Sequence, residues 1–188
     1  MNQTKMELTF ISLLQDRFDL NDHKVDHSVR VSSLAKAFAQ QEGIGSQADL
    51  VAVAALLHEL CNYDRDKVYN TLSDVLAKYG YPESEIATVL SWILDAKTRD
   101  SALHSLSASI VWDANLIDDL GATGLAARFL KVYTSSDSFE AVMDDIQTRE
   151  IYVTDNVITQ TGQAYTVDRG TFVKEYIERF RMEVRGDV

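Results

Sequence analysis

The sequence predicts an all-α fold, a compact bundle of helices. Apolar side chains recur about every 3.6 residues over most of the chain, which is typical of helices that bury one face. Residues that interrupt helices are scarce, with one proline, Pro82, and eight glycines. At 188 residues and 46% hydrophobic side chains, the chain is long enough to bury one substantial core. We therefore expect a single domain over residues 1–188.

The first expected helix covers residues 26–41. Its apolar stripe follows the i, i+3, i+4, i+7 spacing of an amphipathic helix and consists of Val31, Leu34, Ala35 and Phe38. Gly43 ends this helix, because glycine readily adopts the left-handed conformation found at helix C-termini. His27 then lies in its first turn.

The second expected helix runs through VAVAALLHEL, residues 51–60. Ser46, with Asp49 three residues later, resembles a capping box that would begin it. Because this segment is apolar on nearly all sides, the helix should be central in the fold. His58 and Glu59 stand at its C-terminal end.

Two further helices are expected on either side of the proline. The first stops at Gly80, and Pro82 suits the first turn of the second. Since the connection is short, an antiparallel pair is the simplest packing. Their apolar stripes are Val68, Leu72, Val75, Leu76 and Tyr79, and then Ile86, Val89, Leu90 and Ile93.

The remaining chain predicts more helix with one interruption. Residues 107–121 form a helix that Gly121 loosens or ends, and the helical pattern continues afterwards through Leu125, Ala126, Phe129 and Leu130. Residues 151–167 are rich in β-branched and turn-forming side chains, which predicts a loop or a short β-hairpin. Helix resumes near Arg169, and its wide apolar face should dock on the body of the domain. That face consists of Phe172, Val173, Tyr176, Ile177 and Phe180.

Charge and composition exclude several classes of partner. The net charge of −11 repels nucleic acid polymers and anionic membranes, and no cluster of Lys and Arg offsets it. The longest strictly apolar stretch, residues 51–57, is too short to span a bilayer, and the N-terminal residues do not form a signal peptide pattern. A single cysteine, Cys61, excludes an internal disulfide. We expect a cytoplasmic protein.

Four ionisable residues stand in apolar helical surroundings: His27, His58, Glu59 and Asp113. Burying such groups without partners is costly. Imidazole nitrogens and carboxylate oxygens are ligands of divalent ions, so three separate segments could converge on one ion. This ligand set does not distinguish Mn, Fe, Mg, Zn and Ni. The competing interpretation places His58 and Glu59 at the hydrated end of a helix, hydrogen-bonded to backbone.

The first of three motifs around these residues is HKVDHSVRV, residues 23–31, and the second is AALLHEL, residues 54–60. In this order they resemble the metal-binding motifs of the HD superfamily of metal-dependent phosphohydrolases, specifically its small single-domain bacterial members. The resemblance places a metal ligand at His27 and two more at His58 and Glu59. The family has His-Asp where this chain has His58-Glu59.

The third motif, IVWDANLIDDLGATG, covers residues 110–124 and resembles the last metal motif of the family. It places the metal aspartate at Asp113 and a following aspartate at Asp118. The segment FVKEYIERF, residues 172–180, is similar to the final helix of the family. The resemblance thus covers most of the chain.

Several positions depart from the family pattern. Asn62 and Asn115 stand where similar members carry Asp, and Leu116 stands where they carry Arg. The family's histidine between the second and third motifs is absent from residues 91–100, and His104 is displaced from its place. An amide is a weaker ligand than a carboxylate and cannot act as a general base. These replacements remove charge near the site.

The resemblance implies a bound divalent ion and hydrolysis of a nucleotide or another small phosphorylated molecule. His27, His58, Glu59 and Asp113 would hold the ion, and Asp113 and Glu59 would be the catalytic carboxylates. Lys24 and Arg30 could bind the substrate phosphate, although Arg30 is equally typical of a solvated helix face. The alternative is a catalytically degenerate protein that binds a ligand or partner without turnover.

Other side chains admit two interpretations each. His23 is a further ligand or an exposed residue before the helix, and Cys61 is a soft ligand or a small buried thiol. Trp92 and Trp112 line a base-stacking pocket or pack in the core. Apolar faces on the terminal helices permit a homodimer but serve intramolecular packing equally well.

Overall fold

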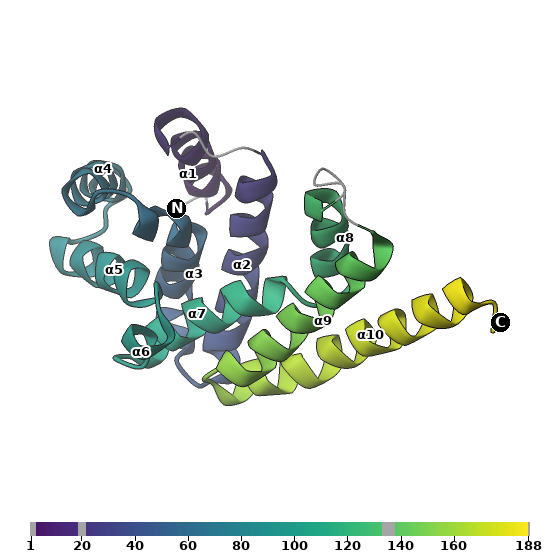
Figure 1. Ribbon diagram of the computed structural model, residues 1–188. Helices are drawn as coiled ribbons and strands as arrows, with labels where there is room; N and C mark the ends of the chain where they lie inside the picture. The colour runs from purple at the N-terminus through teal and green to yellow at the C-terminus, as the bar shows by residue number, and fades with distance from the viewer. Residues whose placement is uncertain (1–2, 19–21, 133–137, 188) are drawn as a thin grey trace. The chain divides into compact units, whose positions relative to one another are not determined.

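A computed structural model describes residues 3–18, 22–132 and 138–187 of the chain (Figure 1). Within these ranges the secondary structure is helical and contains no strand, which confirms the all-α prediction. No helix in these ranges is long and apolar enough to cross a membrane. The chain divides into two compact units, residues 1–114 and 115–188. The single domain expected over residues 1–188 stays a prediction.

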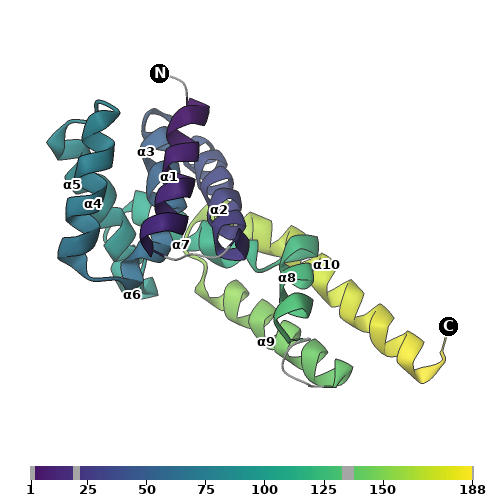
Figure 2. The same cartoon turned by 90° about the horizontal axis from the view of Figure 1, so that it is seen from above.

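The first unit is built from helices joined by short connections (Figures 1 and 2). Helix α3 packs against α2 and α5, α4 packs against α5, and α1 packs against α2. The helices are α1 (Gln3–Phe18), α2 (Asp22–Gln41), α3 (Ala48–Leu56), α4 (Arg65–Lys78), α5 (Glu83–Asp95), α6 (Arg99–Ala102) and α7 (Leu106–Asp118). The 3-10 turns are η1 (Gly45–Gln47) and η2 (His58–Asn62). The division between the units falls within α7.

Helix α3 is central in the first unit, as its uniformly apolar sequence predicted. Seven of its nine residues are buried. Two polar contacts join it to α2: the Ser32 hydroxyl donates to the Ala52 carbonyl at 2.8 Å, and Lys36 Nζ lies 2.8 Å from Asp49 Oδ1. Polar contacts as well as apolar packing therefore hold α2 and α3 together, and η2 follows directly after α3.

Both ends of α3 differ from the sequence prediction. The capping box is wrong, because η1 leads directly into the helix, the N-cap of α3 is Gln47 and not Ser46, and no side-chain hydrogen bond caps this end of α3. At the other end the α-helix stops at Leu56, and His58 and Glu59 lie on a 3-10 turn. Hydrogen bonds of the tighter i to i+3 type define this turn, as the Leu60 N–H bonds to the Leu57 carbonyl at 2.9 Å.

The neighbouring helices follow their predicted patterns closely. Helix α2 begins at Asp22, so His27 lies in its second turn and not its first. Helix α4 ends before Gly80, which has φ +82°, and Pro82 takes the N-cap position of α5. The expected pairing of α4 with α5 is confirmed.

The second unit consists of α8 (Gly121–Val132), α9 (Phe139–Asn156) and α10 (Gln160–Arg185), together with the end of α7. Gly121 has φ +75°, which confirms the predicted break after α7. Helices α9 and α10 form an antiparallel hairpin, and α8 packs on both (Figures 1 and 2). Of the expected apolar face of α10, Val173 and Ile177 are buried, whereas Phe172 stays partly exposed.

The prediction of a loop or β-hairpin over residues 151–167 is wrong. The break in helix is limited to residues 157–159, and α10 begins at Gln160 and not near Arg169. Thr159 caps α10, since its hydroxyl oxygen accepts a hydrogen bond from the Gly162 N–H at 3.0 Å. β-Branched Val153 is fully buried in α9, so packing between helices outweighs its strand preference.

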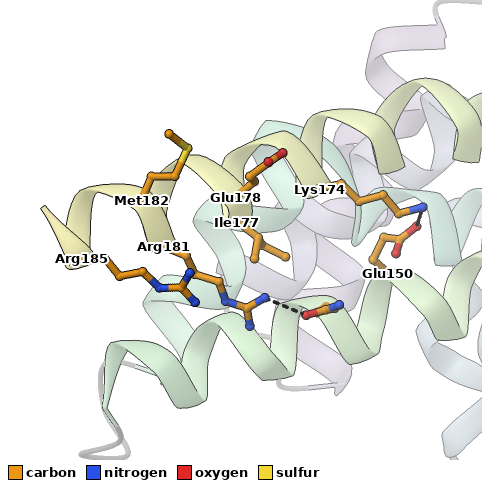
Figure 3. Close-up of a pocket in the computed structure, with 8 residues that line it drawn as sticks. Glu150, Lys174, Ile177, Glu178, Arg181, Met182 and Arg185 are labelled. Atoms are coloured by element: carbon orange, nitrogen blue, oxygen red, sulfur yellow. Dashed lines mark hydrogen bonds and ion pairs between the residues drawn. The ribbon is translucent and has the colours of Figure 1, made fainter. Parts of the chain in front are cut away.

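A buried carboxylate, Glu150, fixes the contact between α9 and α10 (Figure 3). Its Oε1 accepts a hydrogen bond from the Thr154 hydroxyl at 3.1 Å and lies 3.2 Å from Lys174 Nζ. A Cβ atom at Gly170 would lie 3.1 Å from the same oxygen, so the absence of a side chain there makes room for the carboxylate. The group borders a cleft of about 370 Å³.

Candidate metal centre

His27, His58 and Glu59 converge at one place in the first unit. Each offers one ligand atom, and these three atoms lie within 4.8 Å of one another. His27 comes from α2, whereas His58 and Glu59 come from η2, which follows α3. The two imidazole rings meet edge to face, with centroids 5.2 Å apart and an interplanar angle of 72°. The packing of α2 on α3 thus joins three of the four predicted metal ligands.

The orientation of His58 is fixed by the last turn of α3. Its side chain is buried, and Nδ1 lies 2.7 Å from the Ala55 carbonyl oxygen. Because a carbonyl only accepts, Nδ1 carries the proton of this hydrogen bond, and in the neutral ring Nε2 carries the lone pair. A backbone carbonyl on one ring nitrogen is the arrangement that orients histidine ligands of metals.

Glu59 divides its two oxygens between different partners. Oε1 lies 3.8 Å from His58 Nε2, and Oε2 lies 3.5 Å from Lys24 Nζ. The Glu59 side chain is 20% exposed and that of Lys24 is 54% exposed. Lys24 precedes His27 by three residues, so both lie on one face of α2. The sequence interpretation of Lys24 missed this ion pair, because spacing places Lys24 only on the face of α2 that carries His27.

The donor set fits a divalent ion in both chemistry and spacing. Two atoms that each lie about 2.1 Å from one ion are about 3.0 to 4.2 Å apart, depending on the angle between them. The 3.8 Å between Glu59 Oε1 and His58 Nε2 falls within this interval. The widest separation, 4.8 Å, requires a side-chain adjustment of less than about 1 Å. Two imidazoles and a carboxylate suit several first-row ions and select none of them.

Asp113, the fourth expected ligand, is fully buried in α7. The group of three ligand atoms in the described part of the chain does not include it, and its participation stays a prediction. Arg30 is half-buried on α2, one turn after His27, and its role as a phosphate contact is likewise untested. His23 is exposed, but it lies in the first turn of α2 and not before the helix.

The residues that depart from the family pattern have varied surroundings. Asn62 is exposed, and its side-chain amide donates to the Glu59 carbonyl at 3.5 Å. Leu116 is buried, as an apolar side chain should be. Cys61 is half-buried, and burial raises the pKa of its thiol above the ordinary value, against the opposing charge of Lys97. A thiol kept in its neutral form is a poor metal ligand.

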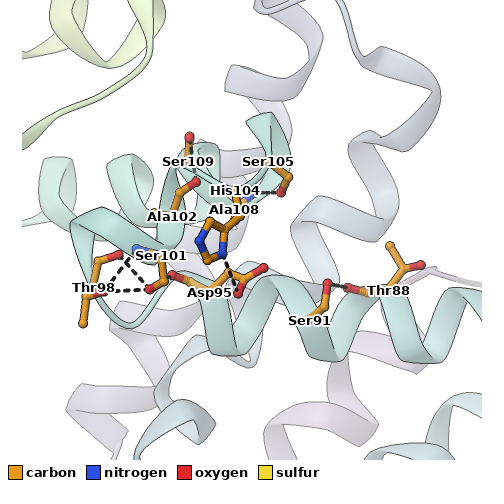
Figure 4. Close-up of polar contacts among 10 residues, drawn as sticks. All are labelled: Thr88, Ser91, Asp95, Thr98, Ser101, Ala102, His104, Ser105, Ala108 and Ser109. Carbon is orange, nitrogen blue, oxygen red and sulfur yellow. Dashed lines mark hydrogen bonds and ion pairs between the residues drawn. The ribbon is translucent and has the colours of Figure 1, made fainter.

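His104, the displaced histidine, lies in a separate polar group (Figure 4). Its ring is 68% exposed, and Nδ1 lies 3.5 Å from Asp95 Oδ1. The Ser101 hydroxyl donates to the Asp95 carbonyl at 2.6 Å and joins this group to the start of α6. Trp92 and Trp112 are both buried, as core packing requires.

Solved structures with a similar fold cover nearly the whole chain. YpgQ from Bacillus subtilis is 22% identical, with coverage of 99% of both chains and a TM-score of 0.77. The structure of YpgQ in complex with ADP is 21% identical, with coverage of 97% of both chains and a TM-score of 0.76.

An HD-superfamily hydrolase from Bacillus thuringiensis gives a similar result. It is 22% identical, with coverage of 98% of this chain and 99% of the other and a TM-score of 0.77. No protein-family model and no curated protein matches the sequence. The chain therefore has the fold of an HD-superfamily hydrolase, as the resemblance implied.

Proposed function

We propose that this protein is a metal-dependent phosphohydrolase that acts on a nucleotide or another small phosphate ester. The observation that carries the proposal is the convergence of His27, His58 and Glu59, whose ligand atoms lie within 4.8 Å of one another. The fold shared with a hydrolase supports it, as does the ADP complex of YpgQ, because ADP contains a phosphoanhydride bond.

In this proposal His27, His58, Glu59 and Asp113 hold the ion. A bound divalent ion supplies Lewis-acid chemistry, since it polarises a phosphoryl oxygen and lowers the pKa of water. The hydrogen bond from His58 Nδ1 to the Ala55 carbonyl keeps the ring oriented without a change of protonation.

The carboxylates and the nearby cations have separate proposed tasks. Glu59 or Asp113 would accept the proton of the attacking water, whose oxygen bonds to phosphorus as the phosphorus–oxygen bond to the leaving group breaks. The leaving oxygen would then take up a proton from the carboxylic acid or from solvent. Arg30 and Lys24 neutralise substrate phosphate, and both are on α2 within one turn of His27. The proposal includes a cytoplasmic location.

A second candidate is a catalytically degenerate protein that binds a ligand without turnover. The burial of Leu116 favours it, because an apolar side chain there gives no contact to phosphate. Asn62 also favours it, since its amide is hydrogen-bonded to the backbone of Glu59 and cannot accept a proton from water.

Metal analysis combined with a hydrolysis assay distinguishes the two candidates. Protein purified without chelator is analysed for bound metal, then loaded with Mn²⁺ and assayed for phosphate release from a panel of nucleotides. Stoichiometric metal and turnover that is lost in Asp113→Ala, but kept in the control Asp95→Ala, supports the hydrolase. Metal without turnover supports the degenerate protein. Absence of metal after loading overturns the hydrolase proposal.

The assembly state stays a prediction of the sequence. The apolar faces on the terminal helices permit a homodimer and serve intramolecular packing equally well. Light scattering coupled to size-exclusion chromatography, at several protein concentrations, measures the mass directly. A single species of 21.1 kDa at all concentrations would contradict the homodimer.

A further inference from the structure

Lys24 brings a protein cation to the centre that the metal ligands form. Its Nζ lies 3.5 Å from Glu59 Oε2, on the side of the carboxylate that does not face His58. Helix α2 carries Lys24 and His27 three residues apart on one face, so both side chains reach the same end of η2. The ammonium group therefore lies beside the same carboxylate that would hold an ion.

The surroundings of Glu59 leave Lys24 as a nearby positive charge. The Glu59 side chain is 20% exposed, so water screens its charge only in part, and the nearby imidazoles of His27 and His58 are neutral when they act as ligands. The Lys24 side chain is 54% exposed and has a long, flexible stem, so its ammonium can move into solvent at small cost. Lys24 can thus serve as a replaceable counter-charge.

We propose that Lys24 is the resident cation of this centre and determines which metal ions it accepts. The ammonium pairs with Glu59 when no ion is bound, and its positive charge opposes the binding of a cation to the same carboxylate. This inference rests on the proposed function, because it presumes that Glu59 is a metal ligand.

The competition acts on one ligand type only. Lys24 contacts the carboxylate, whereas the nitrogen ligands of His27 and His58 are not contested by a cation of this kind. Ions that depend on oxygen ligands, such as Mn²⁺, lose more affinity than ions that bind imidazole well, such as Zn²⁺. Lys24 therefore disfavours Mn²⁺ relative to Zn²⁺.

The same helix offers a matched control. Lys36 also lies on α2 and pairs with a carboxylate, since its Nζ is 2.8 Å from Asp49 Oδ1. Asp49 is 72% exposed and lies at the start of α3, whereas η2 follows the opposite end of that helix. Lys36→Met changes the net charge as Lys24→Met does, without touching Glu59.

Calorimetric titration of the full chain with Mn²⁺ and with Zn²⁺ tests the proposal independently of activity. In Lys24→Met we expect the Kd for Mn²⁺ to fall about tenfold and the Kd for Zn²⁺ to fall by less, about twofold to threefold. Lys36→Met and the charge-conserving Lys24→Arg should both keep the affinities of the unaltered protein. Thermal melts of each variant without metal establish that it is folded.

Two outcomes overturn the inference in different ways. Equal Mn²⁺ affinity in the unaltered protein and in Lys24→Met overturns the role of Lys24 and leaves the metal centre standing. No binding of either ion by any variant overturns the metal centre itself, and the inference fails with it. An equal gain in Lys36→Met shows that net charge alone is responsible and also overturns the role of Lys24.

Discussion

Two glutamates of this protein, Glu59 and Glu150, are each paired with a lysine but differ in what surrounds them. The Glu150 side chain is 4% exposed and has a close ammonium at 3.2 Å together with a hydroxyl donor at 3.1 Å. The Glu59 side chain is 20% exposed, its lysine is at 3.5 Å, and two imidazoles lie beside it. The first carboxylate has donors suited to holding two helices together, and the second has fellow metal ligands.

The difference shows that a lysine beside an acidic residue does not by itself indicate whether that residue stabilises the fold or belongs to a binding site. Glu150 lies within a helix hairpin, where Gly170 makes room for it and the donors are in contact already. Glu59 lies on a 3-10 turn, where one oxygen faces His58 and the other faces the exposed side chain of Lys24. Mutation of each should therefore affect a different measurement.

The largest effect is expected for Glu59→Ala, because it removes one of three converging ligands. We expect the Kd for Mn²⁺ to rise about a hundredfold, while the free energy of unfolding without metal changes by less than about 1 kcal/mol. Calorimetry and urea denaturation measure the two quantities. If the unfolding free energy falls as much as the binding free energy, Glu59 is structural and the contrast with Glu150 is lost.

Glu150→Ala should give the opposite result. Loss of a buried carboxylate and its hydrogen bond should lower the free energy of unfolding by about 2 kcal/mol, discounted because the Lys174 left behind is 67% exposed. The affinity for Mn²⁺ should not change. Glu140→Ala is the matched control, since its ion pair with Arg181 is exposed and should contribute less than about 0.5 kcal/mol.

Glu59→Asp tests the length of the ligand. Aspartate has one fewer rotatable bond than glutamate, so less side-chain entropy is lost when it binds an ion, and it reaches less far toward Lys24. We therefore expect the Mn²⁺ affinity to rise about fivefold. The titration used for Glu59→Ala measures it. An unchanged affinity would show that η2 accommodates the methylene group by which Glu59 is longer than the family's aspartate. The length of Glu59 would then not weaken metal binding.

Gly170→Ala, combined with Glu150→Ala, tests the contact between Gly170 and the Glu150 carboxylate. In the unaltered protein the new Cβ would lie 3.1 Å from Glu150 Oε1, which offsets the gain in helix propensity of about 1 kcal/mol. In the Glu150→Ala background that gain should appear in full. A double-mutant cycle by urea denaturation should therefore give a coupling of about 1 kcal/mol, and additivity would contradict the close contact.

Much of the fold was predictable because the helical period is strong in residues that face a core. The stripes through Val31, Leu72 and Val89 indicated α2, α4 and α5, and all three residues are buried. The prediction of a loop or β-hairpin over residues 151–167 failed because it used strand propensity without the packing between helices. Valine favours strands by propensity, but Val153 is buried in the α9–α10 hairpin. Helix α1 had no clear pattern and was not predicted.

The candidate site was predictable in its ligand types and not in its local geometry. The apolar surroundings of His58 and Glu59, together with the family motifs, identified the group that the packing of α2 on α3 brings together. The change from α-helix to 3-10 turn after Leu56 has no glycine or proline to signal it. The ion pair of Lys24 depends on which way a long side chain turns, and spacing restricts this only to one face of a helix.

The burial of α3 has a consequence for how the metal ligands respond to thermal motion. Because seven of its nine residues are buried, the amide protons of α3 should exchange with solvent only when the first unit opens cooperatively. His58 and Glu59 follow directly after this buried helix, so local fraying should displace them little. An ion bound there would make cooperative opening rarer, and hydrogen exchange in α3 would report its presence from inside the core.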